Sequence, residues 1–263
     1  MKHILVTNDD GYDSAGYYPL VSELKKKYEI TAIAPSEEKS WIGKGISGHN
    51  KVTYNKINHE GEDIFAIDGT PADCVQIGLY SLLDKRPDFI VSGINSGANT
   101  GHGRILSSGT IGAAMEGAID GVVSIAVSLC DTAERSIDYR SADSYKYFEV
   151  PARIAARIIY GLEQVVLPEG IDVISINIPF GVKEDAEIVI TVPHKQPYGK
   201  LFEQNEQGFK TNGIIERYQD LQDGTDLKAV YEGKVSVTPL DLSLANKKAV
   251  AFLEENLVPL IEE

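Results

Sequence analysis

The chain has 263 residues, of which 43% are hydrophobic and 24% charged, the composition of an ordinary globular protein. Its formal net charge of −14 disfavours a nucleic-acid polymer as a partner, because such a field repels phosphate backbones. No apolar run reaches the roughly 18 residues of a membrane-spanning helix and the chain does not start with a secretory signal pattern, so we expect a cytoplasmic protein with no membrane partner.

The first predicted element is a buried strand over residues 4–7, followed directly by Asn8, two adjacent carboxylates and a glycine. Asp9 and Asp10 therefore fall at the carboxyl end of a strand, where open α/β sheets bind ligands. Adjacent carboxylates repel each other unless a cation is present, which favours a divalent metal site. The same residues also suit a simple turn, and their spacing alone does not decide between the two interpretations.

Helical spacing of apolar residues predicts a helix over 14–28, and a second strand follows over 30–34. Residues 41–48 form a predicted loop, and residues 51–67 a pair of short strands or a hairpin. The next helix has Thr70 as its N-cap, Pro71 at its first position and Asp73 as the acid of a capping box. This helix is predicted to run to about residue 83.

Strands over 88–95, 122–129 and 173–178 alternate with a helix over 110–119 and a long helix with Pro151 near its start. Strands that alternate with helices predict a parallel, doubly wound sheet. The expected fold is a three-layer, Rossmann-like α/β core with a mostly parallel sheet. We assign residues 1–180 to this core.

The pattern changes after Pro179. Residues 187–192 and 234–238 suit strands, but the stretch between them is polar and irregular, and residues 245–261 form a terminal helix. We assign residues 181–263 to a C-terminal extension: a hairpin or arm for oligomer contacts, then a strand and a terminal helix that returns to the core.

Two further segments of the predicted core contain residues that suit phosphate binding. Residues 92–101 are rich in Gly and Asn, and Ser107, Ser108, Gly109 and Thr110 open a predicted helix. Free N–H groups at a helix N-terminus bind phosphate readily, although plain N-capping is commoner. With the acidic pair, these loops predict a phosphate-and-metal pocket, and His102 between them is a candidate proton donor or substrate contact.

Standard nucleotide motifs are absent from the sequence. There is no phosphate-binding run of the form G-x-x-x-x-G-K-[ST], no G-x-G-x-x-G after the first strand and no D-x-D pair. Cys74 and Cys130 are far apart and lack metal-ligand spacing.

Several ordered motifs together resemble the SurE family of metal-dependent nucleotidases. They are Val6 to Gly11, Ala34-Pro35, Gly69 to Cys74, Val91 to Asn95 with Gly97 to Asn99, Ser108 to Gly117, Gly224 to Asp226 and Val235 to Pro239. The resemblance covers essentially the whole chain and is strongest over residues 1–130.

This resemblance implies a 5′-nucleotidase that hydrolyses nucleoside 5′- and 3′-monophosphates to nucleoside and phosphate with one Mg²⁺ or Mn²⁺ per subunit. It carries the metal ligands over onto Asp9, Asp10, Ser40 and Asn95, the first two also catalytic. The phosphate contacts carry over onto Asn99, Ser108, Gly109 and Thr110. It also implies a protruding C-terminal hairpin through which subunits form dimers or tetramers.

The chain departs from the family pattern around the second strand. Ser40 is followed by Trp41 where the family has Ser-Gly, and Ser36, Glu37 and Glu38 replace a basic run. The segment 101–107 is one residue longer than usual. These loops surround the pocket, so we expect substrate preference to differ, and Trp41 either stacks on a base or caps the core.

Three alternatives remain open at this point. A broader phosphomonoesterase or an exopolyphosphatase would use the same site. A phosphoacceptor signalling domain also places acids after its first strand, but it needs a later Asp at a strand end, and Asp88 begins a strand instead. A non-enzymatic nucleotide-binding protein would bind without releasing phosphate.

Overall fold

A computed structural model describes residues 1–49, 51–131, 138–195, 197–211 and 221–261. In this part of the chain the main sheet has nine strands in the order β3-β4-β2-β1-β5-β6-β7-β11-β8. They are β1 (His3–Thr7), β2 (Glu29–Pro35), β3 (Tyr54–His59), β4 (Glu62–Ile67), β5 (Phe89–Ser96), β6 (Val123–Cys130), β7 (Val173–Pro179), β8 (Ile188–Ile190) and β11 (Val235–Leu240).

The centre of this sheet is parallel. Strands β4, β2, β1, β5, β6 and β7 pair in parallel, whereas β3 runs antiparallel to β4 and β11 antiparallel to β7. β8 pairs in parallel with β11 at the edge. The predicted mostly parallel sheet is confirmed, and so is the hairpin expected within residues 51–67.

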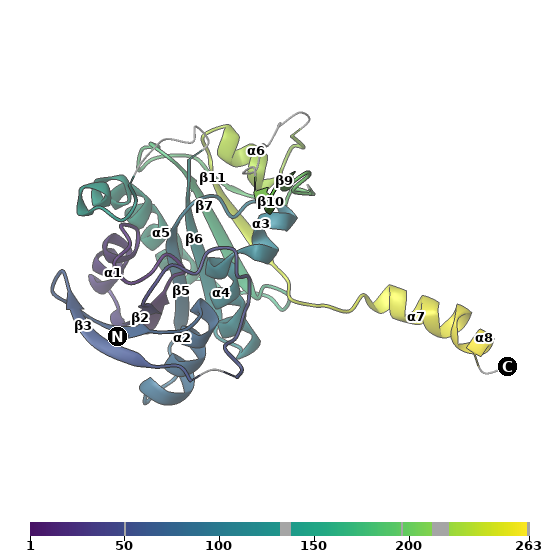
Figure 1. Ribbon diagram of the computed structural model, residues 1–263, viewed down its shortest axis with the longest axis horizontal. Helices are drawn as coiled ribbons and strands as arrows, with labels where there is room; N and C mark the ends of the chain where they lie inside the picture. The colour runs from purple at the N-terminus through teal and green to yellow at the C-terminus, as the bar shows by residue number, and fades with distance from the viewer. Residues whose placement is uncertain (50, 132–137, 196, 212–220, 262–263) are drawn as a thin grey trace.

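Helices cover both faces of the sheet (Figure 1). They are α1 (Tyr17–Lys25), α2 (Pro71–Ile77), α3 (Gly101–Ser107), α4 (Gly109–Ile119), α5 (Glu149–Leu162), α6 (Asp226–Tyr231), α7 (Lys247–Asn256) and α8 (Val258–Ile261), with a π-helical turn at Gly78–Leu82 and a 3₁₀ turn at Ala142–Tyr147. Ile4 and Val6 of β1 pack in the same core cluster as α1 and α5, and Leu5 packs in the cluster that contains α2 and α4. This alternation is why residues 4–6 of β1 are all apolar: both faces of the strand are buried there.

The start of α2 forms as the sequence predicts. Thr70 Oγ1 accepts a hydrogen bond from the Asp73 N–H at 3.0 Å, and Asp73 Oδ2 accepts one from the Thr70 N–H at 2.8 Å. With Pro71 at the first helical position, two of the helix's orphan N–H groups are satisfied locally.

Helix α3 was expected to be loop. It begins after Thr100, and its first N–H, that of Gly101, donates to Asp226 Oδ2 at 2.8 Å. The other oxygen of Asp226 accepts from the N–H of His194 at 2.9 Å. A carboxylate 125 residues away in the chain thus holds the start of this helix, which no local pattern could reveal.

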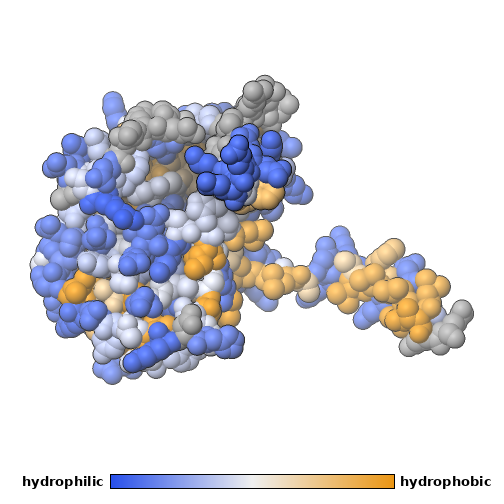
Figure 2. Space-filling model, viewed as in Figure 1, coloured by the Kyte–Doolittle hydropathy of each residue, from blue (hydrophilic) through white to orange (hydrophobic). Residues whose placement is uncertain are grey.

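The C-terminal part extends beyond the core. Strands β9 (Phe202–Asn205) and β10 (Gly208–Thr211) form a separate antiparallel hairpin, while β8 and β11 join the main sheet. After β11 the chain leaves the sheet, and α7 and α8 project away from it (Figures 1 and 2). Neither helix contains a buried residue.

The expectation that the terminal helix returns to the core is therefore wrong for this single chain. β11 runs antiparallel to β7, and Leu240 pairs with Val173 at the amino end of that strand. The chain thus leaves at the edge of the sheet opposite the carboxyl ends, and the side chains of Phe252 and Leu253 stay exposed. Across the described residues, no helix combines the length and apolar character needed to cross a membrane.

Candidate functional site

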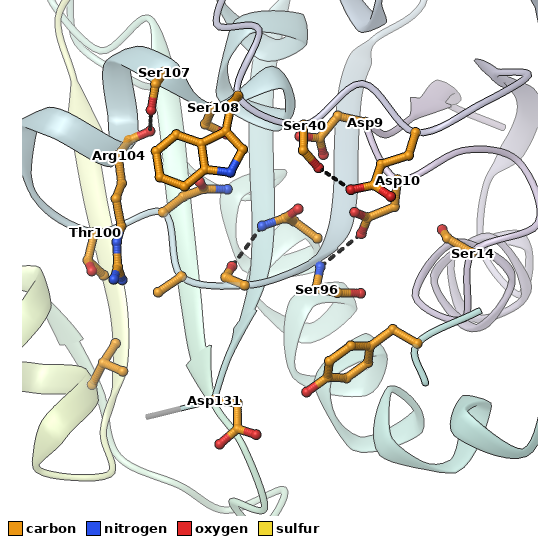
Figure 3. A pocket seen from close by; sticks show the side chains of 18 of the residues that line it. Asp9, Asp10, Ser14, Ser40, Ser96, Thr100, Arg104, Ser107, Ser108 and Asp131 are labelled. Carbon is orange, nitrogen blue, oxygen red and sulfur yellow. Dashed lines mark hydrogen bonds between the residues drawn. The ribbon is translucent and has the colours of Figure 1, made fainter. Parts of the chain in front are cut away.

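A cleft of about 700 Å³ opens at the carboxyl ends of the parallel strands (Figure 3). It lies where the strand order reverses. β2 and β5 flank β1, and the helices that precede them, α1 before β2 and α2 before β5, pack on opposite faces of the sheet. The lining residues come from the loops after β1, β2, β5 and β6 and from α3 and α6. Its volume falls within the range of about 300–1,000 Å³ that is usual for small-molecule sites.

Asp9 and Asp10 lie in this cleft with few partners for their charge. Asp9 is 3% exposed and its Oδ1 accepts a hydrogen bond from Thr110 Oγ1 at 2.5 Å. Asp10 is half-buried and its Oδ2 accepts from the Ser96 N–H at 2.9 Å. Neither carboxylate forms an ion pair with a Lys or Arg of the described chain segments.

Burial raises the pKa of Asp9 to about 6, and burial together with the neighbouring Asp9 charge raises the pKa of Asp10 to about 7. Two acids with raised pKa values side by side in a cleft are a mark of functional sites. Among the described residues, no ion pair with a Lys or Arg offsets these upward shifts.

Two glycines of α4 let the loop of residues 36–48 and the β1 loop approach this helix closely. A Cβ on Gly109 would lie 2.8 Å from Asp9 Cβ and 3.0 Å from the Lys39 carbonyl oxygen. A Cβ on Gly112 would lie 2.4 Å from the carbonyl oxygen of Gly43. Glycine at these positions therefore lets α4 seat Asp9 and draws Ser40 toward the acidic pair.

Ser40 and Asn95 each direct a polar hydrogen to a neighbouring acceptor and keep oxygen lone pairs for another partner. Ser40 Oγ donates its proton to Glu38 Oε1 at 2.7 Å, and Asn95 Nδ2 donates to the Gly97 carbonyl at 2.7 Å. The lone pairs of Ser40 Oγ and Asn95 Oδ1 are then free to bind a cation. Figure 3 shows Asp9, Asp10 and Ser40 gathered at one end of the cleft.

This donor set fits a hard divalent cation. It combines two carboxylates that form no ion pair with any described residue with two neutral oxygens, and oxygen is the ligand type that Mg²⁺ and Mn²⁺ prefer. The described residues contain no group of three or more His, Cys, Asp or Glu side chains placed for a metal. The four residues that the resemblance selected are brought together in one cleft.

The four expected phosphate contacts divide into two kinds. Asn99 and Ser108 line the cleft, and Ser108 Oγ accepts from the Ile111 N–H at 3.1 Å, so its own proton remains available. Gly109 and Thr110 are buried, do not line the cleft, and contact Asp9 instead. In this structure their role is to seat the carboxylate.

His102 does not join the other predicted residues. It is exposed, its Nδ1–H donates to the His194 carbonyl at 3.0 Å, and it is not part of the cleft wall. Its side chain attaches α3 to the chain near residue 194.

The sequence reasoning missed several cleft residues. Glu38 forms an ion pair with Arg140, and the hydrogen bond from Ser40, with the contribution of Arg140, lowers the pKa of Glu38. Arg104 of α3 also lines the cleft, and it is the one basic residue between positions 92 and 110, a feature that could have identified it. Leu227, Val230 and Tyr231 of α6 were not foreseeable, because they lie far away in the sequence.

Comparison with known proteins gives a consistent result. The family model described as Survival protein SurE matches residues 4–200. A protein of Geotalea daltonii named 5′-nucleotidase SurE is 36% identical over 258 residues, covering 96% of this chain and 98% of that protein. A protein of Archaeoglobus fulgidus with the same name is 33% identical, covering 92% of each. The crystal structure of the SurE protein from Aquifex aeolicus superposes with a TM-score of 0.77 at 31% identity, over 96% of this chain and 99% of that one.

Proposed function

This chain belongs to the SurE family, and from that premise we propose that it hydrolyses nucleoside 5′-monophosphates, and 3′-monophosphates, to nucleoside and phosphate. The relatives named 5′-nucleotidase SurE support the reaction class. The observation that carries the proposal here is the pair of adjacent carboxylates, buried Asp9 and half-buried Asp10, which have no ion-pair partner among the described residues and lie in a polar cleft of nucleotide size.

Asp9, Asp10, Ser40 and Asn95 would hold one divalent cation, Mg²⁺ or Mn²⁺, which when bound supplies charge neutralisation at the phosphate and activation of a water molecule. Glu38 supports this set by accepting the Ser40 hydroxyl proton. Thr110 supports it by orienting Asp9. Partners of this kind, which fix the direction of a ligand, typically influence affinity and rate strongly.

The chain's own groups bind the substrate and orient the attack. The hydroxyl of Ser108 is placed to donate to a phosphate oxygen, because it accepts from the Ile111 N–H and does not use its own proton in that bond. Arg104 and Arg140 add positive charge to a wall that otherwise carries the acids. Asp10 binds the Ser96 N–H through one oxygen, so its other oxygen remains to orient the attacking water. Such preorganised groups stabilise the charge that spreads over the phosphoryl oxygens in the transition state.

The exposed C-terminal helices support a second element of the proposal, self-association into a dimer or tetramer through the C-terminal extension. Apolar side chains gather on α7 and α8 away from the rest of the molecule (Figure 2). Those exposed by 45% or more are Val250, Phe252, Leu253, Leu257, Leu260 and Ile261. An apolar surface of this kind is typical of a protein interface, and a second copy of the chain is the partner we propose.

Phosphate release from a substrate panel tests the function. After chelation, the protein is given Mg²⁺, Mn²⁺ or no metal with AMP, 3′-AMP, ribose 5-phosphate and polyphosphate. We expect metal-dependent release, fastest from 5′-monophosphates. Equal release in chelator would contradict the metal site, and release from polyphosphate alone would indicate an exopolyphosphatase.

A further inference from the structure

We propose that Trp41, supported by Tyr198, is the surface on which the nucleobase of the substrate stacks, and that this residue sets the preference for nucleotides, purines above all, over base-free phosphate esters. This inference rests on the proposed nucleotidase function and deepens it. Trp41 is then a specificity-determining residue that lies outside the metal and phosphate positions.

Trp41 does not cap the core, which was the other interpretation that its sequence position allowed. Its side chain is 58% exposed, and it forms part of the cleft wall next to Ser40. The face of a large aromatic side chain that is solvent-exposed on the wall of a polar cleft can be buried only by a ligand or another molecule.

The backbone at Trp41 is held in a conformation that its side chain disfavours. Its φ of 61° lies in the left-handed region, which glycine adopts freely and a bulky residue rarely does. Strain of this kind persists at positions where the side chain has a use. Within the described chain the indole gains one aromatic neighbour and little burial, so folding alone does not account for tryptophan here.

That neighbour, Tyr198, holds the indole in place. The two ring centroids lie 5.7 Å apart with an interplanar angle of 46°. Tyr198 is itself fixed, because its hydroxyl is hydrogen-bonded to Ser107 Oγ and its ring packs on Gly103, where an added Cβ would lie 3.1 Å from ring atoms. α3 therefore supports Tyr198, and Tyr198 supports Trp41, while the indole keeps its exposed surface.

The position of Trp41 also suits the shape of a nucleotide. A 5′-nucleotide joins its phosphate to its base through one ribose, so the base must lie beside the phosphate site. Trp41 follows Ser40, one of the four oxygen ligands of the proposed metal site, and successive Cα atoms are only about 3.8 Å apart. Aromatic stacking accepts every base, and the larger ring system of a purine offers more area than a pyrimidine.

Tyr231 on α6 offers a competing surface, because it also lines the cleft and is 40% exposed. The indole of Trp41 is larger and more exposed than the Tyr231 ring. These differences favour Trp41 as the stacking surface, so variants of both residues must be compared.

The test compares kcat/KM for AMP, UMP and ribose 5-phosphate in the wild type and in Trp41→Gly, Trp41→Phe, Tyr231→Ala and Tyr54→Ala. Glycine relieves the left-handed strain, so Trp41→Gly is expected to fold at least as stably as the wild type. Tyr54 on β3 is a matched control, 56% exposed and outside the cleft.

In Trp41→Gly we expect the ratio of kcat/KM for AMP to that for ribose 5-phosphate to fall roughly 5- to 100-fold, the effect of losing one base–aromatic stack. The corresponding ratio for UMP should fall less, Trp41→Phe should restore most of the loss, and Tyr231→Ala and Tyr54→Ala should keep the wild-type ratio. An unchanged ratio in Trp41→Gly, or a fall confined to Tyr231→Ala, would overturn the proposal.

A binding measurement separates this proposal from the proposed function. Trp41 is the single tryptophan of the chain, so its fluorescence, excited where nucleotides do not absorb, reports directly on the proposed stack. With Mg²⁺ present, AMP should quench it saturably and ribose 5-phosphate should not. Quenching without phosphate release would contradict the nucleotidase function alone, whereas no quenching by AMP would overturn the role of Trp41.

Discussion

The two ends of the central sheet differ in which groups they expose: one end buries carboxylates, and the chain that leaves the other exposes apolar side chains. At the carboxyl ends, Asp9 is buried and Asp10 half-buried, and neither has an ion-pair partner within the part of the chain that the structure describes. At the opposite end, α7 and α8 project from the core, and their apolar side chains are exposed. Under the proposed function, a bound cation would complete the first end and a second copy of the chain would cover the second. The cleft should therefore respond to metal and the tail to protein concentration.

Apart from the loss of a metal-ligating residue, Gly109→Ala should cause the largest fall in activity. The added Cβ would lie 2.8 Å from Asp9 Cβ and 3.0 Å from the Lys39 carbonyl, so the carboxylate must move. Displacing a reacting group by about 1 Å can lower a rate about 100-fold, and we expect a fall of that size in kcat/KM for AMP. The control is Gly161→Ala in α5, where nothing lies within 4 Å of the new Cβ. Similar losses in both variants would contradict this account.

A smaller effect is expected from Thr110→Val, which removes the hydroxyl that donates to Asp9 with little change in volume. Loss of a partner that orients a metal ligand typically lowers affinity or activity about 10- to 100-fold. The loss should appear in the apparent Kd for Mn²⁺, measured by calorimetry, and Thr110→Ser should reverse most of it. Ser124→Ala, which removes a buried hydroxyl bonded to the Val122 carbonyl, should leave the Kd unchanged. Unaltered Mn²⁺ binding by Thr110→Val would count against the positioning role.

The acidic pair should also make the stability of the protein depend on pH and on Mg²⁺. The pKa values of Asp9 and Asp10 are raised above the unfolded value near 4, so without metal the unfolded state loses these protons first as the pH rises from about 4 to about 7. The two groups therefore lower stability as the pH rises, and a cation offsets this by binding the ionised carboxylates. Added Mg²⁺ should raise Tm more at about pH 8 than at about pH 5.5, and Asp10→Asn should weaken this difference. An equal shift at both pH values in the wild type would show that the acids are not the binding groups.

The smallest effect on the fold is expected in the tail. Phe252 is 62% exposed and α7 has no buried residue, so Phe252→Glu should change the free energy of unfolding of a single chain by about 0.5 kcal/mol or less. It should nevertheless lower the mass found by sedimentation across a range of protein concentrations. Lys248→Glu on the same helix is the control for added charge. A mass unaffected by Phe252→Glu would remove the tail from the proposed interface.

The core was predictable from sequence because its determinants are local. The apolar run of β1 and the Thr70–Asp73 capping box each fix an element within a few residues. The position of Asp9 and Asp10 at a strand end followed from the same logic. The family resemblance added Ser40 and Asn95, which a local reading would not have selected.

What the sequence could not predict depends on contacts between distant segments. α3 requires Asp226 for its start, Ser40 requires Glu38 and Arg140 for its orientation, and the α6 wall reaches the cleft through the antiparallel placement of β11. The path of the tail was missed because apolar periodicity shows that a helix buries one face, but not against which molecule.

Phosphate release from AMP by Asp9→Asn, with and without Mn²⁺ after chelation, is the most direct test of the acidic pair as a metal site. Asparagine keeps the size of the side chain and removes the charge, so the cleft should stay folded while its ability to hold a cation is lost. The account predicts at least about a thousandfold fall in kcat/KM with no stimulation by Mn²⁺, since a metal supplies several kcal/mol of transition-state stabilisation. Near-wild-type turnover that Mn²⁺ still stimulates would contradict the assignment of the acidic pair as a metal site.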